Sequence, residues 1–233
     1  MDFIIEPLLN LPHWAILAVL LLFAYLFGAV PFSFMVGKTF FNINLLKEGS
    51  GNLGATNSFR TLGAKAGIGI LLLDIAKGAL PVFFSQLVTF AAGFGPAQSA
   101  WIHIAVALAA IIGHTASPYI RFRGGKGAAT TAGAMLALVP TVFLISAVVF
   151  FLTLALARYV SVATMVTALA FPIATHFVYH SWPLTLFAVV IAVIVPFFHR
   201  ANIKRLREGT EPRFSWRDRG KRAPATAPES ENT

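Results

Sequence analysis

Long stretches without a charged side chain constrain the fold of this chain more than any other feature of its sequence. Four such stretches cover residues 14–36, 78–120, 127–157 and 159–199. Turn residues at 91–96 and 180–183 divide two of them. One helix that crosses a hydrocarbon core about 30 Å thick needs roughly 20 consecutive apolar residues. The sequence therefore predicts an all-α protein with several transmembrane helices.

Composition agrees with this interpretation. Only 12% of the 233 residues are charged, whereas a soluble domain carries about 25%. The formal net charge of +9 indicates an anionic partner, which could be the inner membrane leaflet, a phosphorylated substrate or nucleic acid. We expect membrane lipid and phosphorylated substrates, and no nucleic acid. The sequence contains no cysteine, which excludes disulfides, thiolate metal sites and cysteine nucleophiles.

The number of helices depends on how residues 127–157 are divided, because Pro140 lies near their middle. As one helix this stretch would be about 46 Å long, too long for the bilayer without a strong tilt. Divided in two, it gives seven helices and puts every basic segment outside the membrane on one side. We therefore predict seven transmembrane helices, with the N-terminus outside and the C-terminus in the cytoplasm. The first helix is not read as a signal peptide, because its apolar run is too long and Asp2 and Glu6 precede it.

The first polar segment, residues 49–60, has the sequence GSGNLGATNSFR. Its glycines expose backbone N–H groups that can converge on an anion. The side-chain donors are Ser50, Asn52, Thr56, Asn57 and Arg60, of which Arg60 can grip a phosphate with two parallel hydrogen bonds. An ordinary glycine turn between two helices is the alternative.

The second polar segment, residues 113–130, has the sequence GHTASPYIRFRGGKGAAT. It looks like a nucleotide-binding P-loop, but its spacing differs from the P-loop pattern and no strand precedes it. We therefore exclude a nucleotide-binding P-loop. The segment can still bind an anion, because the glycine amides around Lys126 open a helix whose N-terminus attracts anions. At least one of Arg121 and Arg123 is expected to be an interfacial anchor.

The third polar segment, residues 199–213, has the sequence HRANIKRLREGTEPR. His199 and Asn202 lie three residues apart and share a helix face. Ile203 and Leu206 among basic residues predict a short amphipathic helix on the membrane surface. Further on, Arg217–Arg222 is expected to attach to anionic lipid, and the chain after it is expected to be disordered.

Two ionisable residues fall inside an apolar helix pattern. Asp74 and Lys77 are three residues apart, so they share a helix face and can pair. An ionisable residue inside a membrane span is a functional candidate by default. A structural ion pair near the interface is an equally good interpretation.

Together, the three polar segments resemble the motifs of the bacterial acyl-phosphate:glycerol-3-phosphate acyltransferase family. The resemblance runs in order from the first helix to about Phe214, and the segment 74–78 is also similar to the family. Ala116 departs from the bulky aromatic residue of many members, which affects a packing contact rather than the anion site.

The resemblance implies transfer of an acyl group from acyl phosphate to the 1-hydroxyl of glycerol 3-phosphate, giving lysophosphatidic acid and phosphate. It implies no metal, coenzyme A or carrier protein, a location in the bacterial cytoplasmic membrane, and a soluble acyl-phosphate-forming enzyme as a candidate partner. Residues 1–213 would form one transmembrane domain and residues 214–233 a basic, then disordered, tail. A transporter of an organic phosphate is the main alternative, and a basic lipid-binding scaffold is a weaker one.

We expect phosphate to be held where the three polar segments meet, while Asn52, Thr56 and Asn57 shape the first loop or hold the acyl oxyanion. The candidate catalytic residues are Ser50, Asn52, His114 and His199; the candidate substrate-binding residues are Gly51, Gly54, Thr56, Asn57, Arg60, Gly124, Gly125, Lys126, Gly127, Asn202 and Glu211; Asp74 and Lys77 are supporting residues.

The glycerol hydroxyl is protonated at neutral pH, so a base must accept its proton. His114, His199 and a phosphate oxygen of the substrate are the candidates. We favour the substrate oxygen, because no carboxylate lies close in sequence to orient either histidine.

Overall fold

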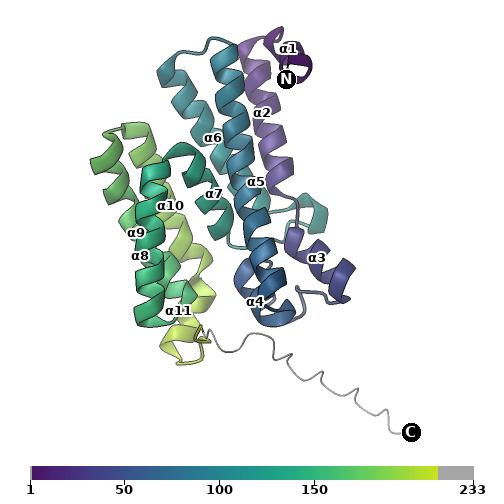
Figure 1. Ribbon diagram of the computed structural model, residues 1–233, viewed down its shortest axis with the longest axis vertical. Coiled ribbons are helices and arrows are strands. Elements are labelled where there is room, and N and C mark those ends of the chain that lie inside the picture. The colour runs from purple at the N-terminus through teal and green to yellow at the C-terminus, as the bar shows by residue number, and fades with distance from the viewer. Residues whose placement is uncertain (1, 215–233) are drawn as a thin grey trace.

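The computed structural model describes residues 2–214, which form eleven α-helices and one short 3-10 helix (Figure 1). The elements are α1 Asp2–Leu9, α2 His13–Gly28, α3 Phe32–Phe41, α4 Ala55–Leu62, α5 Ala64–Ala91, α6 Pro96–Thr115, η1 Pro118–Ile120, α7 Ala128–Leu138, α8 Pro140–Ala157, α9 Val160–Tyr179, α10 Trp182–Phe198 and α11 Arg200–Arg207. Residues 217–222 and the tail beyond them, for which the sequence predicts lipid attachment and disorder, lie outside the described residues.

Proline and glycine set most of the helix boundaries. The predicted division of residues 127–157 is confirmed, because α7 ends at Leu138 and α8 begins at Pro140. Proline is tolerated in the first turn of a helix, where its missing N–H would have had no helical partner. The first apolar stretch differs from the prediction of one continuous helix, since the chain breaks between Gly28 and Phe32, next to Pro31.

Within the described residues, five helical segments are long and apolar enough to cross a membrane, or six if the bent α10–α11 pair is one span. The first of them, His13–Phe41, comprises both α2 and α3. Apolar α7 has only 11 residues, which gives a length of about 16 Å at 1.5 Å per residue. The chain is thus an all-α polytopic membrane protein with five to six candidate spans.

Helix α5 is the central element of the bundle, and it packs against α2, α4, α6 and α7. Its contact with α7 is close because Gly78 lies directly against the backbone of Thr130. Buried Val82 of α5 and Val106 of α6 belong to the same apolar core as Phe187 of α10. The helices α8, α9 and α10 form the other side of the bundle (Figure 1).

The short polar helices gather at one end of the bundle. In Figure 1, α4 and α11 lie at the lower end, whereas α1 lies at the upper end. The chain between α10 and α11 bends by 54°, so α11 turns away from the axis of the helix before it. This end of the molecule therefore holds the first and third polar segments.

Candidate active site

Glu211 organises the segment that follows α11. Its Oε1 accepts hydrogen bonds from Asn202 Nδ2 (2.7 Å) and Ser161 Oγ (2.8 Å), and its Oε2 accepts one from Arg205 Nε (2.7 Å). Backbone N–H groups of Thr210 and Glu211 both donate to the carbonyl oxygen of Arg205, which folds the chain back over α11. Burial disfavours the charged carboxylate, but the three hydrogen bonds outweigh burial and hold the pKa of Glu211 below its usual value. Glu211 is thus a fixed anion between α9 and α11.

Lys126 joins this arrangement from the second polar segment. Its Nζ donates a hydrogen bond to Asn202 Oδ1, whose amide nitrogen in turn binds Glu211. Burial and, to a lesser extent, the positive charges of Arg205 and Arg60 lower the pKa of Lys126 to about 8, against the opposing effect of Glu211. The ammonium group is therefore short of negative charge in its surroundings.

Arg60 brings in the first polar segment. It lies in the last turn of α4 and donates a hydrogen bond from a guanidinium nitrogen to the carbonyl oxygen of Pro212, over 3.2 Å. We call Arg60, Lys126, His199, Asn202, Arg205 and Glu211 the cationic cluster. All three polar segments contribute to it.

His199 lies at the junction of α10 and α11 and is buried. Its Nδ1 lies 2.8 Å from the carbonyl oxygen of Val195. Because a carbonyl oxygen only accepts hydrogen bonds, Nδ1 must carry the proton, which leaves Nε2 as an acceptor in the neutral ring. The charges of Lys126 and Glu211 both act on this imidazole.

In the first polar segment, Asn57 holds the loop in shape. Its Oδ1 accepts a hydrogen bond from the backbone N–H of Ser50 (3.0 Å), and its Nδ2 donates to the carbonyl oxygens of Glu48 (3.1 Å) and Leu45 (3.4 Å). All the polar atoms of this buried side chain are used within the loop. Within residues 2–214, the side chains of Ser50, Asn52 and Thr56 make no hydrogen bond to the cationic cluster, and Ser50 is exposed.

His114 belongs to a second polar group, inside the bundle, and makes no hydrogen bond to the side chains of the cationic cluster in the described structure. Its Nδ1 is 3.8 Å from Asp74 Oδ1. Asp74 in turn forms an ion pair with Lys77 at 2.9 Å, as their spacing in the sequence allowed. No carboxylate lies close to either histidine in sequence, but the fold brings one near each of them. Asp74 faces His114, although the two residues are far apart in sequence, and Glu211 acts on His199.

The cationic cluster has three cations, Arg60, Lys126 and Arg205, and one carboxylate, Glu211. Hydrogen-bond donors and uncompensated positive charge in a partly buried place are suited to binding an anion such as phosphate. Within the described residues, no group of His, Asp and Glu side chains could hold a metal ion.

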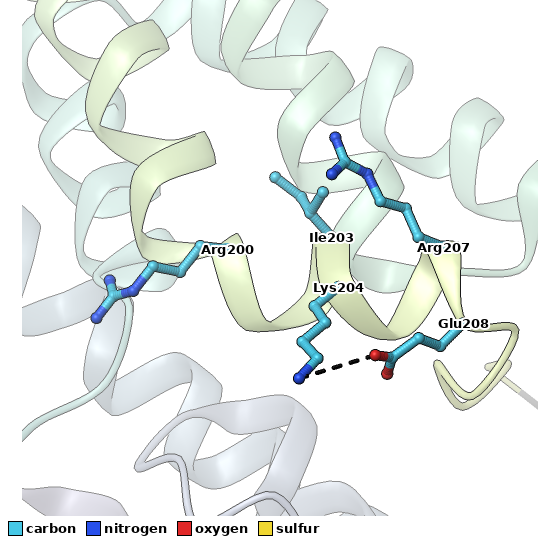
Figure 2. A pocket seen from close by; sticks show the side chains of 5 residues that line it. All are labelled: Arg200, Ile203, Lys204, Arg207 and Glu208. Carbon is cyan, nitrogen blue, oxygen red and sulfur yellow. Dashed lines mark ion pairs between the residues drawn. The ribbon is translucent and has the colours of Figure 1, made fainter.

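A different surface hollow lies along the outer face of α11, between Arg200, Ile203, Lys204, Arg207 and Glu208 (Figure 2). The labelled Arg200 and Arg207 side chains point away from each other in Figure 2, and Lys204 pairs with Glu208 at 3.8 Å. Because these cations diverge, the hollow does not form an anion site like the cationic cluster.

Two members of the site were not predicted from the sequence. Arg205 and Ser161 both bind Glu211, and neither was a candidate. A signal existed for Arg205, which lies three residues after Asn202 on the same helix and so shares its face. Ser161 reaches Glu211 from α9, which no local pattern indicates.

Comparison with known proteins identifies the family. The family model described as glycerol-3-phosphate acyltransferase matches residues 18–209. The chain belongs to this family. The glycerol-3-phosphate acyltransferase of Macrococcus caseolyticus (strain JCSC5402) is 43% identical over 201 residues, which are 86% of this chain and 98% of the relative. That of Staphylococcus aureus (strain JH9) is 40% identical over 199 residues, 85% of this chain and 98% of the relative.

Two solved structures of the acyltransferase PlsY, an integral membrane protein, share the fold. The glycerol 3-phosphate form is 33% identical with a TM-score of 0.77, over 85% of this chain and 96% of that one. The lysophosphatidic acid form is 32% identical with a TM-score of 0.74, over 85% and 95% of the two chains. This acyltransferase is thus an integral multi-pass membrane protein with bacterial relatives, and the alternative of an organic-phosphate transporter is set aside.

Proposed function

We propose that this acyltransferase moves a fatty acyl group from acyl phosphate to the 1-hydroxyl of glycerol 3-phosphate. The hydroxyl oxygen attacks the acyl carbon, the bond from that carbon to the phosphate oxygen breaks, and the products are lysophosphatidic acid and inorganic phosphate. This is a step of phospholipid synthesis. The observation that carries the proposal is the cationic cluster, in which the three polar segments place three cations around a single carboxylate.

Phosphate would replace protein partners at the cluster. Arg60 offers a planar fork and Lys126 a point charge beside glycine amides. Asn202 accepts a hydrogen bond from Lys126, the charge of Lys126 also acts on the His199 imidazole, and Ser50 is exposed in the first loop. Asn52 and Thr56 are partly exposed and remain candidates for binding the developing oxyanion, whereas the contacts of Asn57 support a role in loop shape.

A phosphate oxygen of the substrate is the favoured base. Gly125 packs against Nε2 of His114, which restricts the space for a glycerol hydroxyl at that nitrogen, and Nδ1 faces Asp74. His199 is adjacent to a cation, which disfavours its protonated form. Turnover and binding of glycerol 3-phosphate by His199→Gln as a function of pH test this. If turnover is abolished with normal binding, and a pKa near 6.5 disappears from the profile, His199 is the base.

The arrangement of the membrane spans is proposed to be seven helices, α2 with α3 followed by α5, α6, α7, α8, α9 and α10, with the N-terminus outside. Contacts among the basic loops support it, since Arg60 reaches Pro212, Lys126 reaches Asn202, and Arg158 accepts a backbone hydrogen bond from Phe214. All basic loops then lie in the cytoplasm. Single cysteines at Ser50, Ser99 and Thr210 test it, and external labelling at 50 or 210, or purely cytoplasmic labelling at 99, would contradict it.

The cytoplasmic end would meet both the lipid surface and a soluble partner. The exposed Arg200 stacks over the Phe197 ring at 4.9 Å, which places a cation beside an apolar side chain where α10 ends. This is the pattern of an interfacial helix, and α11 is proposed to lie at the membrane surface. A soluble acyl-phosphate-forming enzyme would deliver the donor at the same face, and the catalytic domain would end near residue 213.

The direct test is phosphate release by purified protein given acyl phosphate, with and without glycerol 3-phosphate. We expect release that depends on both substrates and yields one lysophosphatidic acid per phosphate. Lys126→Ala should remove this activity, while the exposed Lys65→Ala should keep it. Acyl transfer from acyl coenzyme A but not from acyl phosphate would contradict the proposed donor.

A further inference from the structure

The two glycine-rich loops meet at Gly125, and the imidazole of His114 lies at the same point. A Cβ on Gly125 would collide with His114 Nε2 and with the backbone carbonyl oxygen of Leu53, which belongs to the first loop. The backbone N–H of Gly125 also donates to the carbonyl oxygen of His114, over 3.2 Å. One imidazole thus touches the residue before Lys126 at the place where both loops are in contact.

A buried ion pair lies on the other side of this imidazole. Asp74 and Lys77 are only 1% and 2% exposed, and Lys77 Nζ also donates to the carbonyl oxygen of Val30, at 2.9 Å, in the break between α2 and α3. Asp74 Oδ1 lies 3.8 Å from His114 Nδ1, which is too long for a hydrogen bond but close enough to attract an N–H at that nitrogen. The carboxylate is therefore fixed on the Nδ1 side of the ring, and the loops lie on the Nε2 side.

Packing alone does not explain this arrangement. Apolar side chains of similar volume often replace a buried ion pair without loss of stability. Within residues 2–214, moreover, Asp74 Oδ2 and His114 Nδ1 have no hydrogen-bond partner, which is costly for buried polar atoms. Because these buried polar atoms lower stability and lie next to the second loop, they point to a function.

We propose that Asp74 and His114 are positioning residues for the phosphate site. Asp74 orients the imidazole, and the imidazole sets the spacing between the two glycine-rich loops and thereby the place of Lys126. Lys77 holds the carboxylate and balances its charge. The inference rests on the proposed function, because it acts through binding of phosphate by Lys126.

The first test compares two variants that share Lys77→Met, so that neither leaves a buried unpaired charge. Asp74→Asn keeps an oxygen that can face His114, and Asp74→Leu has similar volume without one. Since displacement of a binding group by about 1 Å can cost 10²-fold, we expect the Leu variant to raise KM for glycerol 3-phosphate about tenfold. The Asn variant should raise KM less, because it keeps the oxygen that faces His114 although Lys77 no longer holds it. Equal KM values for the two variants would overturn the proposal.

The second test is a double-mutant cycle of His114→Ala and Gly125→Ala. Each substitution should raise KM, because one removes the imidazole and the other places a Cβ against it. Their combined effect should be smaller than the sum, because His114→Ala removes ring atoms that the new Cβ would meet, although the contact with the Leu53 carbonyl oxygen remains. Additive effects would show that the imidazole does not act through Gly125.

Two further measurements separate positioning from other roles. A variant that only folds less well loses turnover at unchanged KM, so thermal unfolding is measured in parallel, with His103→Gln on the same helix as the control. A change in the pH profile of His114→Gln near pH 6.5 would make His114 a base and overturn the proposal. If Lys126→Ala raises KM and the variants at 74 and 114 do not, the inference fails while the proposed site stands; if Lys126→Ala also leaves KM unchanged, the proposed site itself fails.

Discussion

Within residues 2–214, two groups of charged side chains stand out, and they differ in the balance of positive and negative charge. The Asp74–Lys77 pair inside α5 has one cation and one anion, and its polar contacts are to the protein. The cationic cluster at the end of the bundle has three cations for the single carboxylate of Glu211. A balanced pair can serve the architecture alone, whereas an unbalanced cluster requires an anion from outside. The difference in balance therefore distinguishes the proposed substrate site from its support.

The largest effect should come from removing a cation from the unbalanced cluster. Lys126→Ala should lower kcat/KM for glycerol 3-phosphate by about 10²–10³-fold, the usual loss for one well-placed donor. Lys126→Arg keeps the charge but changes its geometry among the glycines, so we expect a smaller loss. Steady-state kinetics in detergent measure both. If Lys126→Ala is as active as wild type, the cationic cluster is not the substrate site that its excess positive charge indicates.

Removing the anion of the cluster should have the next largest effect. Glu211→Gln keeps the shape but weakens three hydrogen bonds from Asn202, Ser161 and Arg205, and we expect a loss of about 10- to 100-fold in kcat/KM. The matched control is Glu208→Gln, because Glu208 is exposed and pairs only with Lys204 in the described structure. Similar losses in the two variants would show that the three hydrogen bonds to Glu211 do not support activity.

The pH dependence should reveal the uncompensated charge directly. The pKa of Lys126 is lowered to about 8, so the free enzyme has its ammonium form below this pH and loses it as the pH rises. The second pKa of a phosphate ester is about 6, so its dianion forms above that pH. We expect kcat/KM for glycerol 3-phosphate to fall above pH 8, and Lys126→Arg to move this alkaline limb upward. Glu211→Gln should move the alkaline limb to lower pH, because Glu211 raises the pKa of Lys126. If Lys126→Arg leaves the alkaline limb unmoved, a group other than Lys126 titrates there.

The smallest effect should come from exposed cations outside the cluster. The combined variant Arg200→Gln, Lys204→Gln and Arg207→Gln removes the cations around the α11 hollow in Figure 2. Because exposed substitutions rarely change energies by more than about 0.5 kcal/mol, activity in detergent should change less than about twofold. Attraction to vesicles that contain anionic lipid should decrease. A loss of activity in detergent like that of Lys126→Ala would extend the active site onto the outer face of α11.

Local chemistry explains which features could be predicted from the sequence. The end of α7 and the beginnings of α8 and α10 follow from proline positions, and the Asp74–Lys77 contact follows from helical spacing. The family motifs also pointed to Arg60, Lys126 and Asn202, which the structure brings together. The approach of Asp74 to His114 and of Ser161 to Glu211 depends on how helices pack, which no local spacing encodes. The break between α2 and α3 was missed although Pro31 marks it, because the apolar run alone was long enough to span the membrane.

The position of Glu211 after α10, the last apolar helix of the described residues, has a consequence for biosynthesis. The ribosome makes every apolar helix before it reaches the residue that ties Asn202, Arg205 and Ser161 together. A nascent or truncated chain that lacks Glu211 can therefore be inserted in the membrane while its cationic cluster is still unassembled. Assembly of the cluster is in this way coupled to synthesis of the segment that follows α11, and a copy in the membrane that lacks this segment would not consume substrate.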